Sequence, residues 1–211
     1  MAETSGPNEF VREAYGLEDD AGRIDFYRKW AQDYDRQMLD KLGYVSPTLI
    51  ARLLSEFLPD TTASVFDIGC GTGLTCALLS QKGYTRLDGI DLSPEMVAVA
   101  GERHIYRELL VGDVNLELDR DDASYDAVIS SGTFTHGHVG PEPLDEIFRI
   151  LKPGGILACT VHLDLWESMG FRSKFESLVD NGSATCLDLH EDKYYVNGDA
   201  EGWYCIYRKN R

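Results

Sequence analysis

The 211-residue sequence contains no apolar stretch near the roughly 18 residues that a membrane-spanning helix needs. Its first 22 residues, MAETSGPNEFVREAYGLEDDAG, lack the basic start and the apolar core of a signal peptide. The five cysteines are odd in number and include no CxxC pair, so we interpret them as free thiols of a reducing compartment. These absences predict a cytoplasmic protein that does not cross a membrane.

Positive charge is also scarce. The chain has 20 Lys and Arg against 36 Asp and Glu, a formal net charge of −16, and no run of Lys or Arg. Such a field repels the phosphates of nucleic acids and anionic lipid. The charge balance therefore predicts no nucleic-acid partner and no membrane partner, and it favours small or cationic partners.

The remaining composition is typical of a globular protein, with 43% hydrophobic and 27% charged residues. A chain of this length is expected to fold as one domain and to bury about 70% of its unfolded surface. We predict a flexible acidic tail at residues 1–22 and a single domain at residues 23–211. Within that domain, the helices of residues 23–60 would form part of a pocket cover.

Apolar residues recur at three- and four-residue steps over residues 24–42, which predicts a first helix. Ser46 followed by Pro47 is typical of an N-cap and a first helical position. A second helix is therefore expected to run from there to Pro59.

Beyond residue 63, strand-like and helix-like segments alternate. Strands are expected at 64–68, 86–92, 107–114, 125–134 and 155–162, and helices at 74–83, 93–103, 143–155 and near 168–179. This alternation with short connections predicts an α/β fold with a parallel sheet and helices on both faces. Two late strand-like pieces, 184–190 and 202–209, are expected to pair as an antiparallel hairpin at one edge.

The segment VFDIGCGTG places Gly69, Gly71 and Gly73 at a strand-to-helix turn, where bare backbone can approach a ligand. A dinucleotide site would need a further glycine three residues on, where Cys76 stands. Asp67, just before the loop, would repel a pyrophosphate but attract a cationic amino group. S-adenosylmethionine has such a group and no phosphate, so it is the predicted cofactor.

Two further acids follow the next two predicted strands. Asp91 can accept hydrogen bonds from both ribose hydroxyls, and Asp113 can accept from the adenine amino group beside the backbone of Val114. Leu92 and Met96 can sandwich the adenine. Any one of these acids could be a plain loop residue or an N-cap. Three acids at consecutive strand ends around a glycine loop favour the cofactor.

Several motifs together resemble those of the class I S-adenosylmethionine-dependent methyltransferases. They are VFDIGCGTG, GIDLSPEM, VGDV, YDAVISSG and ILKPGGIL, and they span about residues 64–162. YRKWAQDYD and GWYCIYRKNR are similar to the methyltransferase-like proteins of the Williams–Beuren region. The resemblance implies a single doubly wound, Rossmann-like sheet of seven strands in the order 3-2-1-4-5-7-6, with the last strand antiparallel.

By position, the resemblance also implies a set of cofactor contacts. They are Tyr34, Asp67, Gly69, Cys70, Gly71, Asp91, Leu92, Met96, Asp113, Val114 and Ser130. In this set Ser130 would lie beside the methionine part, and Tyr34 would close over the cofactor. The short segment after the fifth strand departs from larger family members, which often carry a substrate lid, and this leaves acceptor recognition open.

Three histidines follow the predicted fourth and fifth strands, where the methyl acceptor is expected. They are His136, His138 and His162. The unperturbed pKa of a histidine side chain suits a general base near neutrality, and we assign that role to His136 first. The alternative is a histidine that hydrogen-bonds loop backbone and only shapes the pocket. A further alternative is that the HxH pair and another imidazole hold zinc or iron, although we predict no metal.

Aromatic residues flank the same region. We expect Trp30 and Trp166 to contact the acceptor with His136, although Trp30 and Phe171 fit plain core packing as well. The leading hypothesis is methyl transfer to a small-molecule acceptor, with S-adenosylhomocysteine as the second product, by a monomer or homodimer. The alternatives are a protein or peptide acceptor, or a module that binds the cofactor without catalysis.

Overall fold

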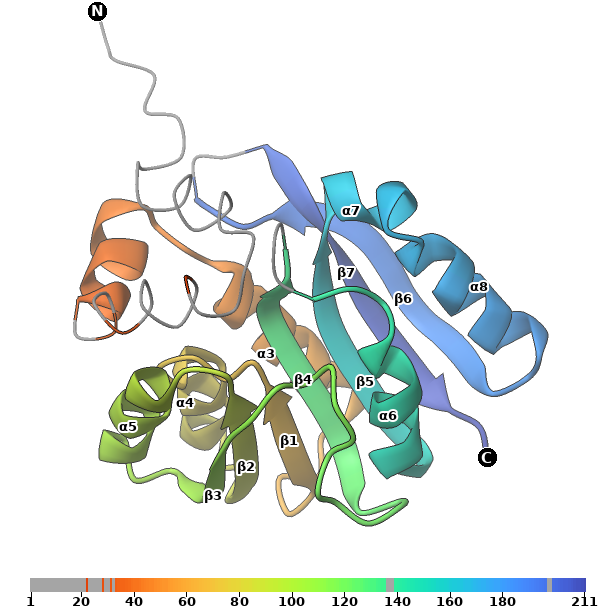
Figure 1. Cartoon of the computed structure of the whole chain (residues 1–211), viewed down its shortest axis with the longest axis horizontal. Coiled ribbons are helices and arrows are strands. Elements are labelled where there is room, and N and C mark those ends of the chain that lie inside the picture. Colours follow the sequence, from red (N-terminus) through yellow and green to blue (C-terminus); the bar gives the residue numbers. More distant parts are fainter. Residues whose placement is uncertain (1–21, 23–27, 29–30, 32, 136–138, 197–198) are drawn as a thin grey trace, which may run out of the picture.

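The computed structural model describes residues 22, 28, 31, 33–135, 139–196 and 199–211. The predicted acidic tail, apart from Gly22, lies outside these residues, as does most of the first half of the first predicted helix. The helices and strands of the described residues are drawn as ribbons and arrows in Figure 1.

Seven strands of the described chain form one sheet of order β3-β2-β1-β4-β5-β7-β6. The strands are β1 (Ser64–Ile68), β2 (Arg86–Asp91), β3 (Tyr106–Val111), β4 (Tyr125–Phe134), β5 (Leu151–His162), β6 (Ala184–Lys193) and β7 (Ala200–Lys209). The first five are parallel, and β7 runs antiparallel to both β5 and β6. The predicted fold class and strand order are confirmed, including the antiparallel pair at one edge.

Helices connect these strands. They are the π-helix η1 (Arg36–Lys41), α3 (Ser46–Phe57), α4 (Leu74–Gln81), α5 (Pro94–Glu102), α6 (Pro143–Ile150), α7 (Leu163–Ser168) and α8 (Phe171–Asp180). The prediction that Ser46 caps α3 was wrong. Val45, which has no polar side-chain atom, occupies the cap position, and Ser46 is the first residue of the helix. The Ser46 hydroxyl instead lies 3.0 Å from the hydroxyl of Ser131 in β4.

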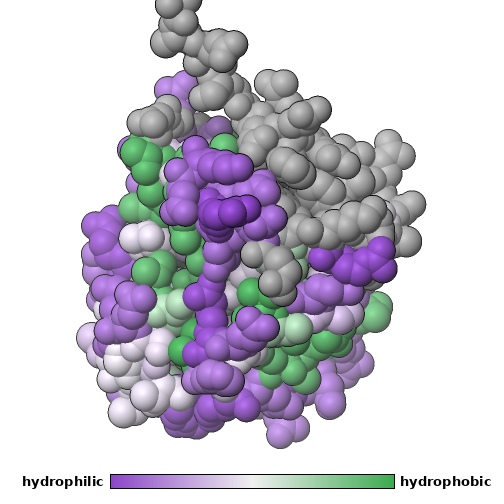
Figure 2. All heavy atoms as spheres, turned by 90° about the vertical axis from the view of Figure 1, so that its left-hand side faces the viewer, coloured by the Kyte–Doolittle hydropathy of each residue, from purple (hydrophilic) through white to green (hydrophobic). Residues whose placement is uncertain are grey.

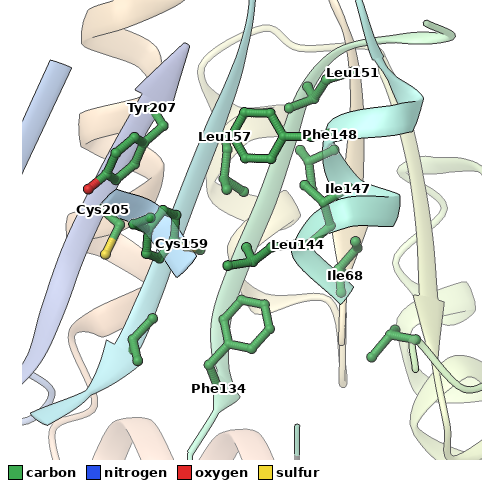
Figure 3. Close-up of a cluster of buried hydrophobic side chains, with 14 of the residues drawn as sticks. Ile68, Phe134, Leu144, Ile147, Phe148, Leu151, Leu157, Cys159, Cys205 and Tyr207 are labelled. Carbon is green, nitrogen blue, oxygen red and sulfur yellow. The ribbon is translucent and has the colours of Figure 1, made fainter. Parts of the chain in front are cut away.

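Helices cover both faces of the sheet, which makes three layers (Figure 1). On one face, α6, α7 and α8 bury their apolar sides against the sheet, and Figure 3 shows part of this cluster, with Leu144, Ile147 and Phe148 of α6 directed at the strands. On the other face, α3 and α4 pack on inward residues such as Val65 and Ile129. The buried pattern of β1, in which all five residues are inaccessible, follows from this double cover.

The edge formed by β3 is the more exposed end of the sheet. Val111, its last residue, is 55% exposed, and Leu116 in the following loop is 65% exposed. Figure 2 faces this side of the molecule and shows hydrophobic residues interspersed among hydrophilic ones.

The strand order predicts a binding crevice between β1 and β4. The chain proceeds outward from β1 to β3 and then returns to the other side of β1 with β4. In open parallel sheets, ligands bind outside the carboxyl ends of the strands at such a reversal. The glycine loop follows β1 at this point, so the fold places that loop and the residues around it where a ligand is expected.

Candidate functional site

Two glycines of the loop are required for different physical reasons. A Cβ atom at Gly69 would lie 2.1 Å from Thr133 Oγ1, so the loop packs closely against β4 there. At Gly71, no atom of the described residues lies within 4 Å of such a Cβ, and φ is +53°. Gly71 therefore offers bare backbone toward open space, whereas Gly69 is a packing residue.

Two of the predicted carboxylates lie at the same edge. Asp91, the last residue of β2, accepts hydrogen bonds from the backbone N–H of Gly71 (2.8 Å) and of Ser93 (2.9 Å). Asp113, just after β3, accepts from the backbone and the side chain of Asn115, both at 2.8 Å. Both acids are partly exposed. Burial still raises the pKa of Asp91, against the backbone hydrogen bonds that lower it.

Asp67 lies beneath the loop. Its side chain is 1% exposed, and its Oδ2 accepts a hydrogen bond of 2.9 Å from the Tyr106 hydroxyl. Burial raises the pKa of Asp67 to about 7, hydrogen bonds from Tyr106 and Cys76 oppose the rise, and Asp91 adds to it. Its contact with a cationic amino group stays a prediction. Sequence reasoning missed Tyr106, because a tyrosine that starts a strand carries no functional pattern.

The residues predicted to enclose the adenine follow the two partly exposed acids in the chain. Met96 is 2% exposed and Val114 is 7% exposed, while Leu92 is only partly buried. Ser93 fixes the start of α5, since its side chain accepts a hydrogen bond of 3.3 Å from the Met96 N–H. The predicted roles of these side chains toward an adenine ring stay predictions.

Three other predicted contacts have roles within the protein. Ser130 is fully buried and donates its hydroxyl to the Ile68 carbonyl over 2.8 Å. Cys70 is 6% exposed, and burial raises the pKa of its thiol well above the usual value. Tyr34 is partly buried and closely precedes η1. For Ser130 and Cys70, the backbone is the part that could still contact a ligand.

A group of hydroxyls beside the end of β4 was not predicted. We call Tyr44, Ser46 and Ser131 the hydroxyl cluster, since the Ser131 hydroxyl lies 3.0 Å from that of Ser46 and 3.5 Å from that of Tyr44. Burial raises the pKa of Tyr44, and the two serines lower it. Ser131 is partly exposed, whereas Tyr44 and Ser46 are buried. The cluster joins the segment before α3 to the crevice side of β4.

His162 ends β5, and the predicted base is held there as a helix cap. Its Nδ1 accepts a hydrogen bond of 3.2 Å from the Asp164 N–H at the start of α7. A neutral imidazole that accepts at Nδ1 carries its proton on Nε2, so Nε2 is a donor in this arrangement. The geometry favours the alternative in which His162 shapes the site through backbone contacts.

Trp166 and Phe171 lie in the core on the α7–α8 face. Trp166 is 6% exposed and stacks between Phe175 and Trp203, with centroid distances of 5.7 and 5.1 Å. Phe171 is fully buried against Phe134. A cavity of about 250 Å³ lies beside this stack. For Phe171, the packing agrees with the plain-core alternative, and the acceptor contact of Trp166 stays a prediction.

His136, His138 and Trp30 lie outside the described residues, so their predicted roles stay predictions. Among the residues that are described, no three His, Cys, Asp or Glu side chains are grouped as metal ligands. In that same part of the chain, no helix has the length and apolar character needed to cross a membrane.

The arrangement fits the predicted cofactor. Around Gly71, no atom of the described residues lies within 4 Å of a Cβ position, and partly exposed carboxylates at the next two strand ends can accept from ribose hydroxyls and an amino group. A carboxylate after the second strand would also suit the ribose of a dinucleotide. The preference for a cationic nucleoside therefore rests on Cys76 in place of the further glycine and on the acid Asp67 just before the loop.

Comparison with known proteins agrees with this assignment. Residues 66–159 match the family model described as a methyltransferase domain. Over 173 residues the chain is 32% identical to methyltransferase-like protein 27 of Homo sapiens, a match that covers 81% of this chain and 69% of that protein. The resemblance found in the sequence motifs is confirmed.

Other relatives are more distant. An 18S rRNA (guanine(1575)-N(7))-methyltransferase of Saccharomyces cerevisiae is 36% identical over 43% of this chain and 33% of its own length. A TehB-like S-adenosylmethionine-dependent methyltransferase of Corynebacterium glutamicum superposes with a TM-score of 0.66 at 22% identity, over 88% of this chain and 99% of that one. The latter likeness concerns the fold alone.

Proposed function

Because the chain belongs to the class I S-adenosylmethionine-dependent methyltransferases, we propose that it transfers the methyl group of this cofactor to a small-molecule acceptor. The observation that carries the proposal is the open backbone of Gly71 at the strand reversal, with Asp91 and Asp113 at the neighbouring strand ends. When bound, S-adenosylmethionine supplies a methyl group on a positively charged sulfur.

The residues of the chain would hold the cofactor in an extended groove. The backbone at Gly71 would receive the methionine end, Asp91 the ribose and Asp113 with Val114 the adenine. These contacts come from backbone and from carboxylates that are already fixed by hydrogen bonds, such as that from the Gly71 N–H to Asp91. Little reordering is therefore needed on binding.

The acceptor side would be formed by the ends of β4 and β5. Ser131 presents a partly exposed hydroxyl there, held by Ser46 and Tyr44. These hydroxyls can donate to or accept from a polar acceptor and can exclude water from its reacting atom. We assign Ser131 to acceptor binding. A general base at His136 or His138 belongs to the same proposal.

Charge and enclosure support a small acceptor over a polymer. The formal net charge of −16 disfavours RNA, although the yeast relative is named as an 18S rRNA methyltransferase. Tyr44 and Ser46 contact Ser131 of β4, and we infer from this contact that the acceptor side is partly covered, whereas a polypeptide acceptor would need an open groove. We extend the proposal accordingly to no nucleic-acid partner and no membrane partner.

The experiment is a transfer assay with radiolabelled S-adenosylmethionine and three acceptor pools: small metabolites, proteins and RNA. Calorimetric titration with S-adenosylhomocysteine comes first, and we expect saturable binding. Label in the metabolite pool would support the proposal. Label in protein or RNA would overturn the small-molecule acceptor, and binding without transfer to any pool would favour a non-catalytic module.

A further inference from the structure

Three side chains from separate elements form a closed ring beside the glycine loop. Thr72, within the loop, donates its hydroxyl to the carboxylate of Asp35, the residue before η1. Arg103, at the end of α5, pairs with the same carboxylate and donates from Nε to the Thr72 carbonyl over 2.6 Å. We call Asp35, Thr72 and Arg103 the loop latch.

The latch differs from an ordinary surface ion pair. Thr72 is 1% exposed, and the side chains of Arg103 and Asp35 are 26% and 34% exposed. The stem of Arg103 also lies close to the loop, since a Cβ atom added at Gly73 would be only 3.2 Å from its Cδ. A fully exposed ion pair adds little to stability, because water screens its charges. The contacts here instead fix both a side chain and a carbonyl of the loop.

The latch also secures the segment that crosses the crevice. Residues 34–46, the cover segment, are held at one end by Asp35 on the loop after β1. At the other end they are held by Tyr44 and Ser46 on Ser131 of β4. Figure 1 shows this part of the chain, in orange, beside the end of the sheet. Tyr34, the predicted cofactor contact, directly precedes the latched residue.

We propose that Asp35 and Arg103 are positioning residues for cofactor binding, because they hold the Gly71–Gly73 backbone and the cover segment in one fixed relation. The inference rests on the proposed function and extends it to residues that touch the loop from outside. Without the latch, the loop backbone and the cover segment would have to be ordered by the cofactor itself, at a cost in affinity. Within the described part of the chain, the hydrogen bonds of the latch join Asp35 and Arg103 to the loop residue Thr72, so the latch acts on cofactor affinity first.

The main test compares two substitutions at one position. Thr72→Val keeps the shape of the side chain but removes the hydroxyl donor, whereas Thr72→Ser keeps the donor. We expect the dissociation constant of S-adenosylhomocysteine, measured by calorimetry, to rise about tenfold in T72V and to change less than about twofold in T72S. Arg103→Met, which removes two contacts, should raise it further.

Arg107→Met is the matched control for loss of an arginine–aspartate pair. Arg107 pairs with Asp88 at the β3 edge, with an Nε–Oδ1 distance of 3.1 Å, and its pairing is away from the glycine loop. We expect R107M to lower the melting temperature without changing affinity for S-adenosylhomocysteine. Equal affinities for wild type, T72V and R103M would overturn the inference, because the latch would then be structural only.

A second readout needs no cofactor. Hydrogen exchange of the amides in residues 36–44 should be faster in T72V and R103M than in wild type, T72S and R107M. Unchanged exchange would also overturn the inference, while leaving the proposed function intact. Failure of wild type to bind S-adenosylhomocysteine at millimolar concentration is a different result: it would overturn the proposed function, and the inference with it.

Discussion

At the ends of β1, β2 and β3, the candidate site consists of backbone and carboxylates drawn from one stretch of chain, residues 67–114. At the ends of β4 and β5 it consists of side chains from distant parts of the sequence, such as Tyr44, Ser131 and His162. We call these the cofactor half and the acceptor half. The cofactor half is constrained by local backbone geometry, and the acceptor half by tertiary packing. Substitutions in the two halves should therefore have different effects.

The largest effect is expected within the cofactor half. Gly69→Ala would press a Cβ against Thr133 in left-handed backbone, at a cost of about 3–4 kcal/mol from overpacking and strain. Gly71→Ala meets only the strain, about 1 kcal/mol. The melting temperature should therefore fall by roughly 10 °C in G69A and by only about 3 °C in G71A.

For affinity to S-adenosylhomocysteine, the order of the two variants should be reversed, with the larger loss in G71A. G71A should lose at least about tenfold in affinity for S-adenosylhomocysteine while it remains folded, since its methyl group enters the space assigned to the methionine end. Adding Thr133→Ala to G69A should recover part of the lost stability, because it removes the clashing Oγ1. If G69A and G71A prove equally stable, the packing role of Gly69 is wrong.

The second prediction concerns how the stability of the protein depends on pH. An unfolded Asp67 ionises near the ordinary pKa of 3.8, but burial raises the pKa of the folded carboxyl to about 7. Between these values the unfolded state binds fewer protons, so stability should fall as pH rises from about 4 to 7 and then level off.

Asp67→Asn removes this titration and should flatten the pH dependence of the free energy of unfolding, measured in urea from pH 4 to 8. The slope should decrease without vanishing, because burial also raises the pKa of Asp91, with the same sign. Asp113→Asn serves as the control for loss of one charge at the same edge. If the free energy of unfolding depends on pH in D67N as it does in wild type, the buried carboxyl of Asp67 is not the source of that dependence.

The difference between the two halves also explains which features could be predicted from the sequence. Strand order, the glycine loop and the positions of Asp91 and Asp113 followed from alternation, motif spacing and the family resemblance, because backbone conformation and strand ends are local properties. That Asp67 is buried agrees with its place in an apolar strand. Its partner Tyr106 was not predictable, because that contact crosses β2 to reach β1.

The acceptor half was harder to predict from the sequence, because its contacts join residues that are distant in the chain. The sequence predicts a helix cap at Ser46, which is the usual local role of a serine before proline. The structure uses its hydroxyl on Ser131, 85 residues away in sequence. Likewise, the sequence places His162 at a strand end but does not show that Asp164 engages its Nδ1. Such choices depend on tertiary neighbours.

A third, smaller effect tests the acceptor half. Ser131→Ala should lower kcat/KM for the acceptor about tenfold and leave affinity for S-adenosylhomocysteine within about twofold, since the hydroxyl cluster lies on the acceptor side. Ser55→Ala is the control, because the Ser55 hydroxyl donates to carbonyls of its own helix. A fall in cofactor affinity with unchanged kcat would instead place Ser131 in the cofactor half.

The smallest effect is expected at His162, where two substitutions separate capping from base catalysis. His162→Asn retains an oxygen that can accept from the Asp164 N–H, whereas His162→Ala removes the cap of α7. Loss of the cap should cost about 1 kcal/mol of stability in H162A only. If Nε2 is a donor as the hydrogen bond implies, turnover in H162N should stay within about threefold of wild type. A general base would be lost equally in both variants, so a fall of about a hundredfold in H162N would restore His162 as the base.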